Sequence, residues 1–498
     1  MKIRYIIAAL ALGSASLTGC SLDEDLSSFT SPTTFYATKA QCESALNAVY
    51  NSLNPTFNYQ FMLAVEACTD IGYCNGSDNS CRLIVSPSTA GIGQTVWTQS
   101  YKGVVNANAA IYGIENAKSI TDDDRNQMVG EGKVMRAFYY HLLTSFFGDV
   151  PFYTQAVLSR EEQTKVSQLP RMSAYDTRDS LIRDLQRCVP LMAQRRTSEE
   201  PDNRSGAAMG WMLIAKMAMW NEQWDTAIEA IEKLEALYGD LMQYPLEDVL
   251  FRNKNTPESI FEIQHTYTPG GLAYTSNVAC VGTPPRTAGT CIYGGVEMPE
   301  LGDQSTIWGS VRPTTYFHAT LMFEGSGDKR EGLWIIHSTY NGMPLTGQGI
   351  NTFGPKFWCP NMQAGRDYNN YKIFRYADAL LLKSECYYHK GDRANCIEYL
   401  NKVKRRAGLS DYTFRNEARL WDEIMDERGR ELLGEFKRKF DLVRWGVWYE
   451  RTSSFNERAD VKNNIQPYHE YYPIPDVEVA YSHYILDNKA YETGSSDL

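Results

Sequence analysis

Aromatic residues with hydrogen-bonding neighbours offer the clearest chemistry in this sequence. Trp308, Tyr316 and Trp334 fall in a stretch with many glycine, proline and threonine residues, close to Asp303 and Arg312. A flat indole or phenol ring presents an apolar face to the C–H face of a sugar ring, and carboxylate or guanidinium groups nearby can bind the hydroxyls. The stretch therefore predicts a surface that binds a hydroxyl-rich ligand by stacking and hydrogen bonding.

Other aromatic residues are weaker candidates for the same role. They are Tyr73, Tyr274, Tyr293, Tyr340 and Trp358. Large aromatic side chains also dominate protein cores, so packing is the competing role for every one of these rings. The sequence does not separate the two roles residue by residue, and we expect at least two of the candidate rings to face a ligand.

Charged residues three or four positions apart crowd the segment 426–441. Glu427 precedes Arg430 by three positions, and Arg438 precedes Asp441 by three. Such pairs add only ~0.2–0.5 kcal/mol each on an exposed helix, so their density indicates a partly buried network that links helices. Arginine can bridge carboxylates there in bidentate fashion. Because arginine keeps a carboxylate ionised, these residues would be poor acids, and we expect a structural role.

The usual signatures of catalytic and metal sites are missing. The seven histidines fall nowhere at metal-ligand spacing, and the sequence has no zinc-protease, nucleophile-elbow, phosphate-loop or C-x-x-C pattern. We therefore predict no catalytic residue, no metal and no cofactor. A glycosidase needs only two placed carboxylates, which have no spacing signature, so a surface hydrolase stays open as an alternative.

The N-terminus looks like a bacterial lipoprotein signal. Lys2 and Arg4 precede a short apolar run that ends in Leu17, Gly19 and Cys20. The run is too short to span ~30 Å of hydrocarbon. The small residues before the cysteine favour cleavage in front of Cys20 and its acylation, over an ordinary secretory cleavage site. More than one acyl chain on this residue would anchor the protein durably to a membrane.

The charge balance argues against nucleic acid as a partner. The formal charge is −11 at pH 7, and removal of residues 1–19 takes away two basic residues and no acid, which leaves −13. Ten cysteines follow Cys20 in an exported, oxidising setting. Two groups in loop-like sequence are candidates for disulfides of open connectivity: Cys68, Cys74 and Cys81, and Cys280 with Cys291.

Two helical portions flank a loop-rich portion. Apolar residues at helical spacing predict helices over residues 41–53, 96–117 and 122–147. Between residues 251 and 366 this periodicity fades, and only residues 258–264 alternate like a strand. Loops of this length in a compact protein are usually functional, so we expect the ligand-binding portion here.

Two helix pairs fit the tetratricopeptide pattern. Ala215 and Ala227 provide the small residues that let two helices approach closely, and Ser384 and Cys396 fall at the same offsets later in the chain. We therefore predict a mostly α fold, with a tetratricopeptide-like hairpin scaffold and a loop-rich binding portion. The expected parts are a signal peptide (1–19), a lipidated tether (20–40), an N-terminal helical scaffold (41–250), the binding portion (251–365) and a C-terminal helical part (366–498).

Several separated stretches together resemble the SusD/RagB family of outer-membrane lipoproteins. They are MRAFYY and FGDVP within residues 135–151, ESIFEI at 258–263, residues 399–408, 427–446 ending in DLVRWG, and YPIP at 472–475. The resemblance covers nearly the whole chain after Cys20. It implies four tetratricopeptide-like hairpins behind a loop-built binding face and no catalytic activity. The implied partners are an oligosaccharide, a SusC-like TonB-dependent β-barrel transporter and the outer membrane. The lipid anchor would attach the protein to that membrane, on the side that faces the cell exterior. Peptide cargo is the alternative within the family.

Overall fold

A computed structural model describes residues 36–266, 274–284, 291–301, 308–347, 351–360, 362 and 365–494. The lipoprotein signal with Cys20, and also Asp303, therefore lie outside the described residues. Within the described ranges, no helix is both long enough and apolar enough to cross a membrane.

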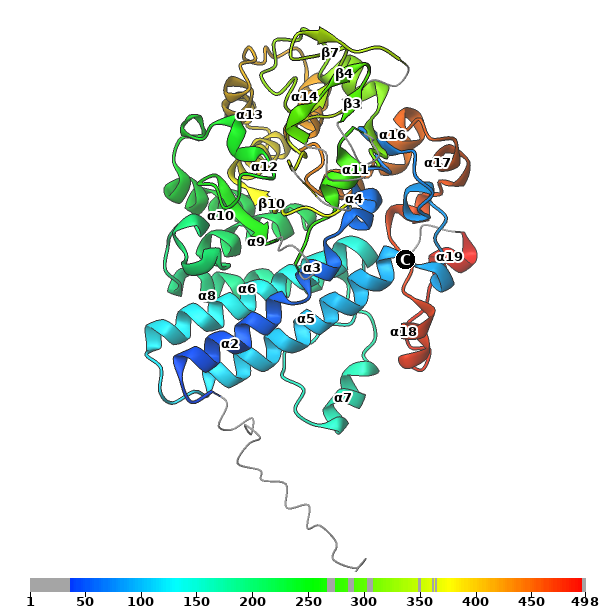
Figure 1. The fold of residues 1–498 in the computed structure, drawn as a ribbon. Coiled ribbons are helices and arrows are strands. Elements are labelled where there is room, and N and C mark those ends of the chain that lie inside the picture. The colour runs from blue at the N-terminus through cyan, green and yellow to red at the C-terminus, as the bar shows by residue number, and fades with distance from the viewer. Residues whose placement is uncertain are drawn as a thin grey trace, which may run out of the picture.

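Helices build most of the molecule, as the sequence predicts, and they pack side by side as antiparallel neighbours (Figure 1). The long helices α5 and α6 pack against each other, and α2 packs on both of them. The main helices are α2 (Lys39–Tyr50), α5 (Ile92–Glu115), α6 (Asp122–Phe147), α8 (Ala174–Cys188), α9 (Ala207–Trp220), α10 (Trp224–Tyr238), α12 (Tyr376–His389), α13 (Arg393–Arg406) and α14 (Glu417–Glu431).

Both predicted hairpins form. Helix α9 packs on α10 and α12 packs on α13, and Ala215 and Ala227 are fully buried where the first pair meets. The second pair is joined through Gly391, whose φ of 73° is a left-handed conformation that glycine adopts without a steric penalty. The two hairpins also contact each other through α10 and α12, which makes one continuous helical body.

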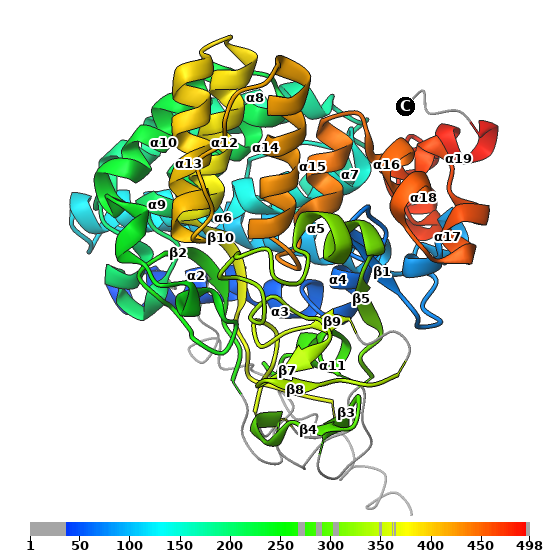
Figure 2. The same ribbon diagram turned by 90° about the horizontal axis from the view of Figure 1, so that it is seen from above.

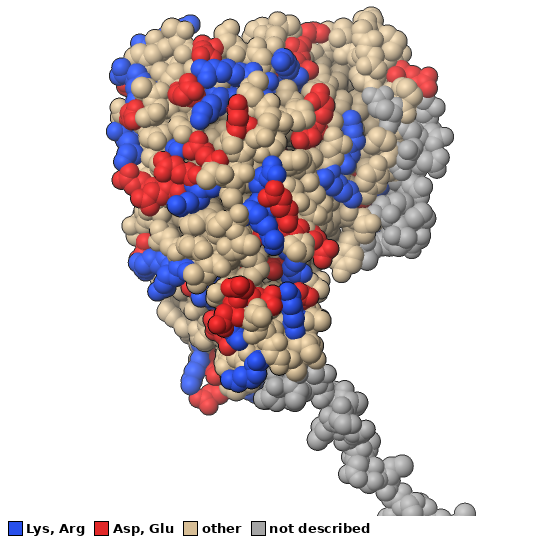
Figure 3. Space-filling view, turned by 90° about the vertical axis from the view of Figure 1, so that its left-hand side faces the viewer, with Lys and Arg blue, Asp and Glu red and all other residues tan. Residues whose placement is uncertain are grey.

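Shorter helices connect this body to the rest of the chain. They are α3 (Leu53–Thr56), α4 (Tyr59–Val65), α7 (Arg160–Ser167), α11 (Val278–Gly282), α15 (Arg438–Arg444), α16 (Trp448–Phe455), α17 (Ala459–Asn464), α18 (Asp476–Tyr481) and α19 (Lys489–Thr493). On the face that Figure 3 shows, acidic and basic side chains are interspersed, and no broad basic patch is present there.

The loop-rich portion projects from one side of the helical body (Figure 2). The described strands, most of them in this portion, are short and pair antiparallel in twos. The pairs are β1 (Gly72–Cys74) with β5 (Val311–Pro313), β2 (Ser259–Ile263) with β10 (Tyr371–Arg375), β3 (Ile292–Tyr293) with β4 (Val296–Glu297), β6 (Ile335–Ile336) with β9 (Thr352–Phe353), and β7 (Thr339–Tyr340) with β8 (Met343–Pro344). The turn from β3 to β4 uses Gly294 and Gly295, both at positive φ, as a tight hairpin of the primed type requires.

A second, smaller core lies inside the loop-rich portion, separate from the core beneath the helices. It contains Cys291, Val296, Met298, Leu301, Ile336, Tyr340, Leu345 and Trp358. Tyr340 and Trp358, two of the weaker ligand-binding candidates, are thus buried packing residues. The ten described cysteines are all buried, and no disulfide links Cys68, Cys74 and Cys81 to one another or Cys280 to Cys291, the two groups for which disulfides were expected.

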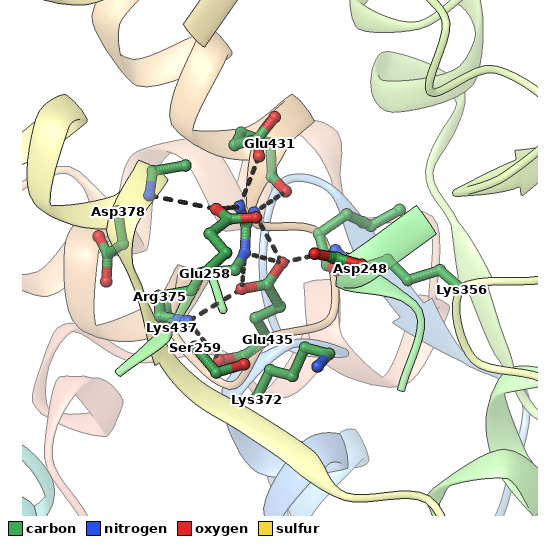
Figure 4. Close-up of polar contacts among 12 residues, drawn as sticks. Asp248, Glu258, Ser259, Lys356, Lys372, Arg375, Asp378, Glu431, Glu435 and Lys437 are labelled. Carbon is green, nitrogen blue, oxygen red and sulfur yellow. Dashed lines mark hydrogen bonds and ion pairs between the residues drawn. The ribbon is translucent and has the colours of Figure 1, made fainter. Parts of the chain in front are cut away.

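A buried ionic network joins the loop-rich portion to the C-terminal helices (Figure 4). We use this name for Glu258, Arg330, Lys356, Arg375, Arg406, Glu431 and Glu435. Arg375 donates to Glu258 at 3.0 Å, to Glu431 at 2.6 Å and to Glu435 at 2.8 Å. From the loop-rich portion, Arg330 donates to Glu431 at 2.7 Å and Lys356 to Glu435 at 2.7 Å.

Buried ion pairs confirm the structural role expected for the charged segment 426–441. Glu427 pairs with Arg430 at 2.7 Å, as predicted. Arg438 instead pairs with Asp70 of the N-terminal part at 2.6 Å, and Asp441 pairs with Arg428 at 2.7 Å. Burial opposes ionisation of Glu431, but Arg375, Arg406 and Arg330 outweigh it and hold the pKa of Glu431 at about 2. This carboxylate is therefore a fixed anion and a poor general acid.

Candidate ligand-binding surface

Trp308 presents its ring to solvent while its backbone is held in place. The side chain is 53% exposed. Its backbone N–H donates to the carbonyl of Cys280 at 2.9 Å, and so does that of Gly309 at 3.1 Å. The ring meets the half-buried ring of Tyr59 in an edge-to-face arrangement, with centroids 5.5 Å apart. Such a pair offers an apolar platform whose orientation is set by the protein.

Tyr59 occupies the first position of α4, and its place is fixed from both sides. Asn58 caps this helix, since its side-chain oxygen accepts from the backbone N–H of Gln60 at 2.8 Å and of Phe61 at 3.2 Å. The backbone N–H of Tyr59 donates to the side chain of Asn277 at 2.9 Å. The side chain of Gln60 donates to Asp78 at 3.0 Å, which places an amide and a carboxylate close to the platform.

Tyr73, Arg312 and Tyr293 form a second group. Tyr73 and Arg312 face each other across the β1–β5 pair. The Arg312 guanidinium donates to the Tyr293 hydroxyl at 3.2 Å and lies 5.7 Å from the centre of that ring. Arg312 is only 8% exposed, so it orients Tyr293 more than it offers a charge to solvent. Both tyrosines are half-buried.

The two groups are joined by one short segment. Arg312 follows Trp308 by four residues, so their Cα atoms are at most ~14 Å apart. The loop after β1 runs beside this segment, because the backbone N–H of Asn75 donates to the carbonyl of Ser310 at 2.8 Å. We refer to Tyr59, Tyr73, Tyr293, Trp308 and Arg312 as the aromatic surface. Stacking platforms with hydrogen-bonding neighbours, as here, fit a hydroxyl-rich ligand.

The tyrosines of this surface remain neutral phenols at ordinary pH. Burial raises the pKa of Tyr59, Tyr73 and Tyr293 above the usual value, and Arg312 opposes the rise only in part at Tyr73 and Tyr293. Their hydroxyls can therefore donate hydrogen bonds as well as accept them.

The structure contradicts the expectation that Trp334 offers a ring to a ligand. Its side chain is fully buried. The indole N–H donates to the backbone carbonyl of Glu431 at 3.2 Å, and the Lys356 ammonium lies 4.6 Å from the ring centre. The residue follows Arg330, which enters the ionic network, and the chain therefore carries Trp334 into the core.

Tyr316 is half-buried and its polar group is already engaged. Its hydroxyl donates to Asp426 at 2.7 Å and accepts from Arg451 at 2.9 Å. Its ring stacks on Phe455 at 4.1 Å between centroids. These contacts tie the segment after β5 to the C-terminal helices, which makes Tyr316 a support for the aromatic surface.

Tyr274 is 53% exposed but lies elsewhere, on the rim of a cavity next to α2 and β2. Asp303 lies outside the described residues. Tyr59 was not among the predicted site residues, because the segment YQFMLAV has the pattern of a uniformly apolar core helix. The signal that was available is Asn58: a capping residue directly before Tyr59 places the tyrosine in the first helical turn, at the end that faces the loops.

Comparison with known proteins decides the family. A model described as SusD family matches residues 350–491, and a model described as starch-binding associating with outer membrane matches residues 22–212. This chain belongs to the SusD family. SusD-like protein P25 from Formosa agariphila is similar over 99% of this chain and 100% of its own length, at 24% identity.

Solved structures share the SusD fold. Surface glycan-binding protein A from Bacteroides uniformis aligns with a TM-score of 0.72 and 21% identity, and the alignment covers 91% of this chain and 100% of that one. Surface glycan-binding protein A from Bacteroides thetaiotaomicron, in complex with laminarihexaose, aligns with a TM-score of 0.69 and 20% identity over 90% of this chain and 98% of that one.

Proposed function

We propose that this SusD-family protein is a non-enzymatic surface lipoprotein that binds an oligosaccharide on its aromatic surface. The exposed ring of Trp308, packed edge-on against Tyr59, carries the proposal. Single exposed apolar side chains are common on protein surfaces. This ring is also held in a fixed aromatic pair beside hydrogen-bonding side chains, which is the arrangement on which a sugar ring can stack. The related structure that holds laminarihexaose supports a glycan over a peptide as the cargo class.

The delivery step and the membrane anchor belong to the same proposal. Acylation at Cys20 would hold the protein on the outer membrane with its binding face toward the cell exterior. A SusC-like TonB-dependent barrel would then receive the bound glycan. Replacement of Cys20 by Ala should release the protein from membranes and abolish fatty-acid labelling, and mild detergent extraction of the unaltered protein should recover a large barrel with it. Continued labelling of the variant, or elution of the cross-linked protein alone, would count against this part.

Calorimetric titration with defined glycans tests the binding step. The panel is laminarihexaose, maltohexaose and cellohexaose, with a mixed tryptic peptide digest as the alternative cargo. We expect heat with at least one hexasaccharide, no heat with the digest, and no shortened sugars after long incubation. If only the peptides bind, the cargo is a peptide and not a glycan. Turnover that survives rigorous purification would favour the hydrolase alternative.

A further inference from the structure

Two cysteines converge at the base of the loop that follows β1, beside the aromatic surface. Cys74 ends β1, and Cys81 lies in the helical turn at residues 80–82; both side chains are fully buried. Their thiols are in hydrogen-bonding contact with each other. Both also contact Gly76, whose backbone N–H donates to the Cys74 sulfur at 3.1 Å and whose carbonyl accepts from the Cys81 thiol at 3.9 Å.

The surroundings of Cys74 favour its thiolate form. The hydrogen bond from Cys81 lowers the pKa of Cys74 below its usual value; burial opposes this, and the Gly76 N–H and the Arg458 guanidinium add to the lowering. Arg458 is held at the site because it donates to the backbone carbonyl of Cys74. The thiolate is the form of cysteine that attacks a disulfide, so Cys74 is the nucleophile of the pair.

Cys68, the third cysteine of this group, makes a different contact. Its thiol donates to the backbone carbonyl of Ser80 at 3.2 Å, and burial raises its pKa to about 12. It therefore stays protonated at ordinary pH, and a protonated thiol is a poor nucleophile. The geometry thus favours Cys74 and Cys81 as the reacting pair.

The loop between the two cysteines, residues 75–80, supports the aromatic surface. Asp78 accepts from Gln60 at 3.0 Å, and the backbone N–H of Asn75 donates to the carbonyl of Ser310 at 2.8 Å. Gln60 and Ser310 each lie within two positions of a ring of the aromatic surface. A covalent link at the base of the loop would hold both contacts in place and lower the cost of ordering them when a ligand binds.

We propose that Cys74 and Cys81 form a disulfide that closes the loop 75–80 beside the aromatic surface. The structure shows the pair before this bond forms, since neither cysteine is in a disulfide. The inference rests on the proposed function, because disulfides persist in the oxidising compartments that an exported protein enters.

The oxidant is a small-molecule or protein disulfide. The Cys74 thiolate attacks one sulfur of the oxidant and releases a first thiol; Cys81 then loses its proton to solvent, attacks the Cys74 sulfur and releases a second thiol. The two cysteines lose two electrons and two protons, and the oxidant is reduced to two thiols. Asn75, Ser77 and Asn79 are exposed, so local opening of this loop admits the oxidant to the buried sulfurs.

Peptide mapping tests the bond directly. The purified, reduced protein is equilibrated with reduced and oxidised glutathione in dilute urea that opens loops, and is then alkylated in strong denaturant. Chymotrypsin and trypsin, which cut after Tyr73 and Arg82, release residues 74–82 with Cys74 and Cys81 as their cysteines. We expect this peptide to be unalkylated and lighter by two hydrogen atoms than its reduced form. Alkyl groups or glutathione on both cysteines, or a link from either to Cys68, overturns the proposal.

Serine variants test what the bond does for binding. Cys74→Ser and Cys81→Ser should each bind a responsive hexasaccharide roughly two- to tenfold more weakly than the oxidised parent, the cost of ordering about one side chain. Cys68→Ser keeps a donor for the Ser80 carbonyl and is the matched control, expected to bind like the parent. Equal affinity of all these proteins would overturn the role of the bond in binding. Failure of every hexasaccharide to bind would count against the proposed function, and the peptide map would still decide the bond.

Discussion

Each of two regions of the molecule involves one tryptophan from the loop-rich portion. Trp308 is part of the aromatic surface, Trp334 packs against the ionic network, and the two rings have opposite surroundings. Trp308 is 53% exposed and only its backbone is held, whereas Trp334 is fully buried between Lys356 and the backbone of Glu431. An aromatic residue can contribute to ligand binding when its backbone is fixed and the face of its ring is open to solvent. It contributes to stability when its N–H and both faces are engaged.

The ionic network should give the largest effect on stability. Glu431→Gln removes the charge that Arg330, Arg375 and Arg406 share, which leaves three buried guanidinium groups short of a counter-charge. Breaking one partner of a buried ion pair costs ~3–5 kcal/mol, so we expect a loss of that size in the free energy of unfolding. Denaturant titration measures it, with the exposed Glu161→Gln variant as the control, expected within ~0.5 kcal/mol of the parent. Equal stability of both variants would show that the network is dispensable.

Acid titration sharpens the same comparison. The pKa of Glu431 is about 2 in the folded protein, against ~4.3 for an unfolded glutamate. Its stabilising contribution is therefore complete above about pH 4.3 and is lost as the pH falls toward 2. The parent protein should lose stability over this range more steeply than Glu431→Gln, which lacks the titrating group. Parallel pH profiles would contradict the assignment.

Trp334→Ala should have the next largest effect: it should lower the free energy of unfolding and leave ligand affinity unchanged. Truncation of a fully buried tryptophan opens a cavity and costs ~3–5 kcal/mol. Below its unfolding transition, the variant should bind a hexasaccharide with the parent affinity, measured by calorimetry. A stable variant with weak binding would return Trp334 to the ligand site.

Trp308→Ala should show the reverse pattern. Loss of one stacking platform should cost on the order of 1–2 kcal/mol of binding, which is about ten- to thirty-fold in affinity. The melting temperature should barely change because the ring is half exposed. Tyr112→Ala, another exposed aromatic residue far from the loops on α5, is the control for nonspecific stickiness. Equal binding by both variants would move the ligand away from the aromatic surface.

A change of pH should have the smallest effect, which we expect on the affinity for the ligand. Since the pKa values of Tyr59, Tyr73 and Tyr293 lie above that of a free tyrosine, these phenols stay neutral between about pH 6 and 9. Affinity for the hexasaccharide should therefore change less than about twofold over that range. A steep change near neutrality would indicate that another titratable group contacts the ligand.

Local patterns were enough to predict the helical elements. Helix α6 runs over the predicted residues 122–147, and the small residues Ala215 and Ala227 lie buried where two helices meet. The strand expected over residues 258–264 is β2, Ser259–Ile263. These predictions succeed because periodicity and close-packing residues act between neighbours in the chain.

The candidate site was only partly predictable. Trp308, Tyr73, Tyr293 and Arg312 were all named from the sequence, but their grouping was not visible there. Tyr73 meets Arg312 only because β1 pairs with β5, and these strands are more than two hundred residues apart in the chain. Tyr59 was missed because an apolar helix predicts burial of all its residues, although the first turn of this one reaches the loops.

The sequence by itself therefore determined the helical scaffold, the position of the loop-rich portion and the family resemblance, since each depends on local composition and spacing. Only the tertiary structure decided which aromatic rings are open. Trp308 and Trp334 lie in similar local sequence, and long-range contacts separate them: the chain enters the buried ionic network at Arg330 and carries Trp334 inward, whereas Trp308 is fixed through its backbone to Cys280 and keeps its ring in solvent. Ring exposure depends on residues distant in the chain, and no local pattern encodes it.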